Sequence, residues 1–236
     1  MIIMKSKLIF SALLLLTISF AVVAQEEEGW ESKKFEVGDF SEISIEGAFK
    51  VYLVQGDQCA VTVKTTNGDL FDDIKIKRNQ NEVDIKLDQS LFNFSRVSLY
   101  ITFKTLEKLR IEGGVNMKTN GYLDLNNFAV DIEGGANVDL YLKADKVKIY
   151  GEGGFLFELK GVANALDITI NGAGHVDAAE LKTKDVSFIT AGFGTGSVYA
   201  TENLNAKIEG VGKLRFKGNP KINQYIDGLG SVKPFQ

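Results

Sequence analysis

The sequence predicts an all-β protein, a right-handed parallel β-helix (a solenoid) with rungs of about 18–21 residues and a less regular N-terminal portion. Three observations predict this fold. The 236-residue chain contains 24 glycines but only 2 prolines, a glycine motif recurs at a short period, and apolar and polar residues alternate between the motifs. Glycine allows tight turns, whereas proline would remove hydrogen-bond donors from a continuous sheet.

The glycine motif marks the rungs of the predicted solenoid. It occurs, for example, as IEGGVNM at 111 and as IEGGANV at 132. Its first glycines are Gly113, Gly134, Gly153, Gly172, Gly192, Gly210 and Gly228, and an earlier copy places Gly47 upstream. The spacing is too short for ankyrin or tetratricopeptide units, and the leucine-rich signature is missing.

Each repeat reads as two short strands that flank a glycine turn. Val130, Ile132, Val138 and Leu140 share one face by period two, with charged residues between them. Stacked rungs would satisfy each other's backbone and bury these faces against one another. Residues 106–236 are therefore expected to form regular rungs, and parallel crossovers favour the right-handed form.

Residues 35–105 continue the β pattern with looser spacing. Because Gly47 carries the same motif, we expect wider, irregular rungs of one β-helix domain over 35–236 rather than a separate sandwich. The candidate strands are Glu42–Glu46, Phe49–Val54, Ala60–Thr66, Asp73–Lys77, Glu82–Leu87 and Val97–Phe103. The polar stretch 25–34 is expected to be a flexible N-terminal arm.

Residues 1–24 have the features of a secretory signal peptide. Lys5 and Lys7 precede an apolar run over 8–20, and small residues end at Ala24. Cleavage there would leave a net charge of −6 instead of −4 and no further apolar segment long enough to span a membrane. The expected location is the periplasm, the cell surface or the extracellular space.

The sequence carries no motif for catalysis or for a cofactor. The acidic balance argues against nucleic acid as a partner. Cys59 is the only cysteine and shares a strand face with valines, so we expect a buried apolar role. His175 is the only histidine, and although it shares a face with Asp177, no zinc ligand set surrounds it. We therefore expect no catalytic residue, no metal site and no cofactor.

An acidic column is the first candidate ligand-facing feature. The residue before the repeat glycine is Glu112, Glu133, Glu152, Glu209 and Asp227 in five of the regular rungs, and Glu46 in the upstream copy. Stacked carboxylates suit a cation such as Ca²⁺. They also suit a solvated face that resists edge-to-edge aggregation, and with one carboxylate per rung this second interpretation is preferred.

Exposed aromatic residues are the second candidate feature. Tyr122, Tyr141 and Tyr150 lie in adjacent rungs and are candidates for stacking against a glycan, whereas Phe155 and Phe157 are expected in the core. The short turns leave little room for the deep cleft that polysaccharide lyases and glycoside hydrolases use.

The opening FSEISIEGAFKVYLVQGD at 40–57, the IEGG turns and the leader together resemble the head GIN domain family of auto-transporter adhesins. The resemblance covers nearly all of the chain after the leader. It implies an exported β-helix protein of Bacteroidota-type bacteria with an adhesin-like role.

Two functions remain open from the sequence. The first is an exported, non-catalytic adhesin-like module that binds a glycan, an envelope or surface protein, or another copy of itself. The alternative is a carbohydrate-active β-helix enzyme that would use acidic residues such as Glu133 and Glu152, since adjacent rungs place them about 5 Å apart.

Overall fold

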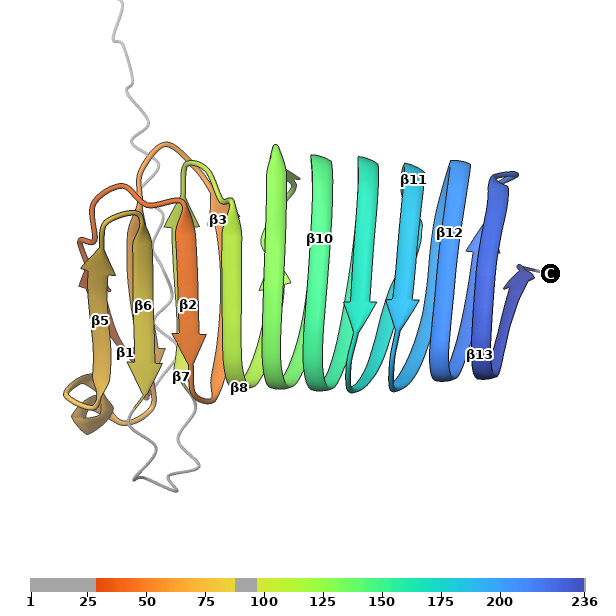
Figure 1. The fold of residues 1–236 in the computed structure, drawn as a ribbon. Helices are drawn as coiled ribbons and strands as arrows, with labels where there is room; N and C mark the ends of the chain where they lie inside the picture. The colour runs from red at the N-terminus through yellow and green to blue at the C-terminus, as the bar shows by residue number, and fades with distance from the viewer. Residues whose placement is uncertain (1–28, 88–96, 236) are drawn as a thin grey trace, which may run out of the picture.

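The computed structural model describes residues 29–87 and 97–235. These residues form a β-solenoid of about 6 turns without α-helix, which confirms the predicted fold class (Figure 1). The predicted signal peptide over 1–24 lies outside the described residues. No described residue belongs to a helix of the length and hydropathy needed to cross a bilayer.

Each rung has a front and a rear segment joined by a glycine bend. In the first rung these segments are the strands β2 (Glu42–Glu46) and β3 (Phe49–Gln55). The strand β8 (Lys108–Thr119) passes through the bend and pairs in parallel with both of them. Figure 1 shows the front and rear segments as two faces of a flattened coil.

The regular rungs follow β8 in sequence order. They comprise β9 (Leu123–Asp124), β10 (Asn127–Ile170), β11 (Ala173–Thr190), β12 (Phe193–Lys217) and β13 (Lys221–Pro234). Equivalent repeat positions face each other across the rungs; for example, Asn137 pairs with Asn116 and Ile226 with Ile208. The glycine period therefore equals one rung, as predicted.

Direct stacking of backbone on backbone explains the recurrent glycine. Gly153 has a φ of +103°, and a Cβ atom built on it would lie 2.6 Å from the carbonyl oxygen of Gly134 in the rung before. Gly134 lies on Gly113 in the same way. A side chain at these positions would strain the backbone and separate the rungs.

The core runs along the interior of the coil and follows the predicted alternation. Val130, Ile132, Val138 and Leu140 are buried, and so are Phe155 and Phe157. Outward residues between them are exposed or half-buried. The strands of a rung cannot bury these apolar faces alone, so stacking of the rungs supplies the stability.

The N-terminal portion is less regular, as predicted, and its strands do not stack in chain order. The strands β6 (Glu82–Leu87) and β7 (Val97–Phe103) pair in parallel with β2 and β3, on the side away from β8. The strands β4 (Ala60–Thr65) and β5 (Ile74–Asn79) then lie outside them and run antiparallel.

A short connection accounts for the antiparallel pairing of β5 with β6. Only Gln80 and Asn81 separate β5 from β6, and a two-residue link joins antiparallel neighbours but cannot make a parallel crossover. A 3₁₀ turn, η1 (Gly68–Phe71), connects β4 toward β5 and buries Leu70.

The ordered sheet begins earlier than the sequence predicts. The strand β1 (Glu31–Phe35) pairs antiparallel with β4, so 31–34 belong to the sheet rather than to a flexible arm. The Glu31 carboxylate also accepts a hydrogen bond of 3.1 Å from the Gly68 backbone N–H. This strand escaped detection because its side chains are mostly exposed, so it carries no apolar alternation.

Candidate functional site

The acidic residues of the column lie on adjacent rungs in the structure, but two rungs without an acidic residue at this position interrupt the column. Register pairs Glu112 with both Glu46 and Glu133, and Glu209 with Asp227. The stacked glycines place Glu152 next to Glu133. The same stack puts Asn171 and Ala191 between the two acidic halves.

Lysine side chains form ion pairs with two of these carboxylates. Lys86 lies 2.8 Å from Glu46, and Lys207 lies 2.9 Å from Glu209. The hydrogen bond with Glu46 is the main reason why the pKa of Lys86 is raised. Among the residues that the structure describes, no group of three or more acidic, histidine or cysteine side chains is arranged to hold a metal ion.

Tyr150 joins the acidic column instead of an aromatic platform. Its hydroxyl donates a hydrogen bond to Glu152 and accepts one of 2.9 Å from the side-chain amide of Asn171. The bond to Glu152 is the main cause of the raised pKa of Tyr150, which favours the protonated donor. This small network links two successive rungs at the outer face of the glycine bend.

The other two candidate tyrosines meet each other. Tyr122 and Tyr141 make an edge-to-face contact with ring centroids 4.7 Å apart and planes at 75°. Both remain substantially exposed, at 43% and 49%. The Tyr141 backbone N–H donates a hydrogen bond of 3.1 Å to the Thr119 hydroxyl. This bond ties the backbone that carries the Tyr141 ring to the preceding rung. Such pairs are worth about 0.5–1.5 kcal/mol, so the two rings support one another.

A shallow hollow of about 540 Å³ adjoins Tyr141, and we call it the tyrosine hollow. It is lined by Thr119, Gly121, Asp139, Tyr141, Lys160, Gly161 and Glu180. Lys160 lies 2.7 Å from Glu158 and 4.0 Å from Asp139, and the bond to Glu158 is the main reason for its raised pKa. The hollow thus combines one aromatic face with carboxylates and an ammonium group.

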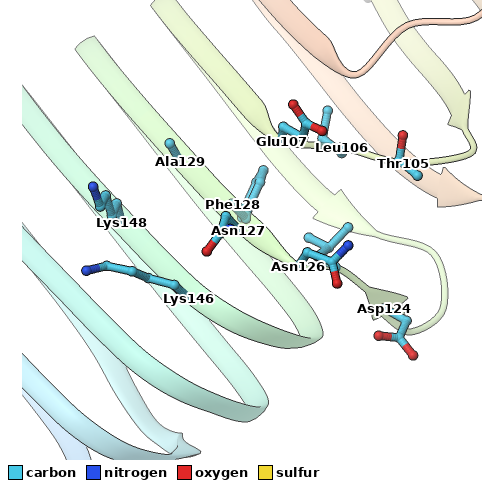
Figure 2. Close-up of a pocket in the computed structure, with 11 residues that line it drawn as sticks. Thr105, Leu106, Glu107, Asp124, Asn126, Asn127, Phe128, Ala129, Lys146 and Lys148 are labelled. Atoms are coloured by element: carbon cyan, nitrogen blue, oxygen red, sulfur yellow. The ribbon is translucent and has the colours of Figure 1, made fainter.

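A second hollow of about 560 Å³ lies where the irregular segment before β8 meets the next rungs (Figure 2). Figure 2 shows Asn127 between Glu107 on one side and Lys146 and Lys148 of the following rung on the other. Its apolar lining includes Leu106, Leu125 and Phe128, which are buried.

Polar contacts hold the rim of this second hollow. The Gln55 side-chain amide donates to the Asp124 carbonyl over 2.9 Å, and its oxygen accepts from the Asp124 N–H over 2.7 Å. Lys146 forms an ion pair of 2.6 Å with Asp167 in the next rung. The repeat motif does not predict this hollow, because its lining lies away from the glycine bends, in 105–107, 124–129 and at Lys146 and Lys148.

The remaining candidate residues, Cys59, His175 and Asp177, have the surroundings of structural residues. Cys59 is buried and free. The Nδ1 atom of His175 lies 2.7 Å from the Thr195 hydroxyl, while Asp177 accepts a hydrogen bond from the Ala179 N–H. His175 and Asp177 therefore have separate partners, and the geometry shows no acid–base dyad.

Comparison with solved structures finds the same fold in proteins from Bacteroides and Parabacteroides species. A putative adhesin from Bacteroides fragilis superposes with a TM-score of 0.82 at 24% identity, covering 89% of this chain and 98% of that chain. A putative adhesin from Parabacteroides distasonis gives a TM-score of 0.68 at 25% identity, covering 87% and 97%. A putative lipid binding protein from the same species gives 0.69 at 20% identity, covering 89% and 98%.

Two of these proteins are described as putative adhesins and one as a putative lipid binding protein. No curated protein matches the chain. The sequence model of one family, described as "Putative auto-transporter adhesin, head GIN domain", matches residues 39–220. The resemblance to this family, which rested on the opening motif and the IEGG turns, is thus confirmed. The chain belongs to the head GIN domain family.

Proposed function

We propose that the protein is an exported, non-catalytic adhesin-like module whose tyrosine hollow binds a glycan. The observation that carries the proposal is the exposed Tyr122–Tyr141 pair beside Asp139, Lys160 and Glu180. The family's description as adhesins supports an adhesin-like role in general.

The chemistry of the hollow suits a neutral, hydroxyl-rich ligand. The flat face of a sugar ring presents C–H groups, which pack against an aromatic ring with little loss of conformational freedom. Asp139 and Glu180 would accept hydrogen bonds from sugar hydroxyls, and Lys160 would donate. Two carboxylates and one ammonium group leave the hollow with only a small net negative charge, so the site offers no strong attraction to a highly charged polymer.

The openness of the site favours binding over turnover. The lining residues come from the outer faces of adjacent rungs, and no long loop among them closes over a ligand. Glycosidic bond cleavage uses a desolvated acid and subsites that distort the sugar, which an open surface does not supply.

Tyr141→Ala is expected to weaken glycan binding at least about tenfold, because it removes the stacking face and leaves Tyr122 unsupported. The measurement is biolayer interferometry against a panel of immobilised neutral and acidic polysaccharides. Tyr150→Ala is the matched control, since it removes an exposed tyrosine in the Glu152 network and not in the hollow.

Two results would contradict the glycan proposal. One is a polysaccharide that binds equally well to the wild type and to Tyr141→Ala. The other is release of reducing ends or unsaturated products from any member of the panel, which would favour the enzyme instead.

Export is the second part of the proposal and rests on the leader-like residues 1–24. Protein recovered from the native envelope or medium is expected to begin at Gln25, as read by N-terminal sequencing. Recovery of the protein with Met1 intact, or only from the cytoplasm, would contradict export while leaving the binding proposal open to test.

A further inference from the structure

The strand β13 leaves the C-terminal end of the core open. No strand in the described ranges 29–87 and 97–235 pairs with its outer edge (Figure 1). Ile222 and Ile226 stack on Leu204 and Ile208, which are fully buried, yet the two isoleucines are 43% and 38% exposed. They occupy inward positions of a rung that no other rung of the described residues covers.

The opposite end of the solenoid is built differently. There, β1 and β5 form the outer edges with the sequences ESKKF and IKIKRN, and η1 tucks Leu70 into the core. Lysine-rich edge strands of this kind discourage pairing with other chains. The front segment of β13, KINQYID over 221–227, has a single lysine and two core-facing isoleucines.

This front segment is complementary to itself when two copies run antiparallel. With Gln224 opposite its own copy, Lys221 faces Asp227 and Ile222 faces Ile226, and each pairing occurs twice. Register with Leu204 and Ile208 places both isoleucines on the inner face, so both isoleucine pairs would extend the core. Gln224 pairs with the buried Ala206 and faces inward as well, so the two Gln224 side chains would meet at the axis. A shift of one residue would place these side chains on opposite faces of the sheet.

We propose that β13 is a homodimerisation edge: two copies pair antiparallel through residues 221–227 about a two-fold axis at Gln224. A two-fold axis perpendicular to the front sheet keeps inward side chains inward in both copies, so the solenoid continues into its partner. Opposite charges directly across antiparallel strands stabilise the pairing, and they also select this register.

Reversing one charge tests the register. Lys221→Glu places like charges opposite each other at both ends of the paired segment, and we expect dimer dissociation to become at least about tenfold easier. Adding Asp227→Lys to the same chain restores opposite charges and should restore the dimer. The measurement is sedimentation equilibrium of the purified protein over a concentration series.

Lys213→Glu is the matched control because it makes the same change on an exposed position of β12, one rung away from the edge. It should leave the association constant unchanged. A wild-type protein that stays monomeric at high micromolar concentration would overturn the proposal. So would a dimer that ignores Lys221→Glu, or one that the double charge reversal fails to restore.

Cross-linking gives an independent test that does not depend on affinity. The native Cys59 is buried, so Gln224→Cys introduces one accessible thiol per chain at the two-fold axis. Directly opposite residues of antiparallel strands have Cα atoms about 4.5–5.5 Å apart, within disulfide range. Mild oxidation should yield a covalent dimer from Gln224→Cys and none from Lys213→Cys; equal yields from both would contradict the assigned register.

Discussion

Gly153→Val is expected to lower the free energy of unfolding by about 3–5 kcal/mol, because it combines backbone strain with a direct clash. The φ of +103° disfavours a β-branched residue, and the new Cβ would approach the Gly134 oxygen to 2.6 Å and its nitrogen to 2.9 Å. Backbone atoms of the neighbouring rung form the obstacle, so no side-chain rotation relieves it. Chemical denaturation followed by far-ultraviolet circular dichroism measures the loss.

Gly154→Ala is the matched control on the next residue. Gly154 does not have a positive φ in the disfavoured range, and a Cβ atom built on it would meet no atom within 4 Å. The substitution should change stability by no more than about 0.5 kcal/mol. Similar losses of unfolding free energy at both positions would contradict the view that only the first glycine of each motif is required for the rungs to stack.

Phe157→Ala is expected to cost about 3–5 kcal/mol, since it removes a large side chain that is 1% exposed and leaves a cavity. Each rung contacts only its neighbours, so the lost contacts lie within the rung of Phe157 and the rungs immediately before and after it. The same denaturation assay should show a lower midpoint.

Leu156→Ala serves as the control for this second result. Leu156 precedes Phe157 on the same strand but points outward and is 55% exposed. Its removal should shift the stability by no more than about 0.5 kcal/mol. A large effect at Leu156 with a small one at Phe157 would invert the assigned faces of the strand.

Local rules explain why the regular rungs were predictable. Alternation assigned Val138 and Phe157 to the core, and the glycine period gave the length of a rung. Both signals are local: strand side chains alternate with period two, and only glycine fits where backbones stack at the bend. The family membership followed from the same residues.

The candidate site was predictable only in part. The sequence placed Tyr122, Tyr141 and Tyr150 in adjacent rungs, but the fold pairs the first two and gives Tyr150 to Glu152. Tyr150 lies before the glycine of its rung, in line with β2, whereas Tyr141 lies after a glycine, in line with β3. The face of the coil on which an exposed tyrosine lies therefore depends on whether it precedes or follows the glycine bend of its rung.

The sequence alone predicted the all-β solenoid, its rung length, its core and its acidic column, because each depends on spacing within one repeat. The stacking order of β6 and β7, the edge strand β1 and the two hollows came from the three-dimensional fold. These features arise from contacts between segments far apart in the chain, where exposed strands and turns have no periodic apolar pattern to reveal their partners.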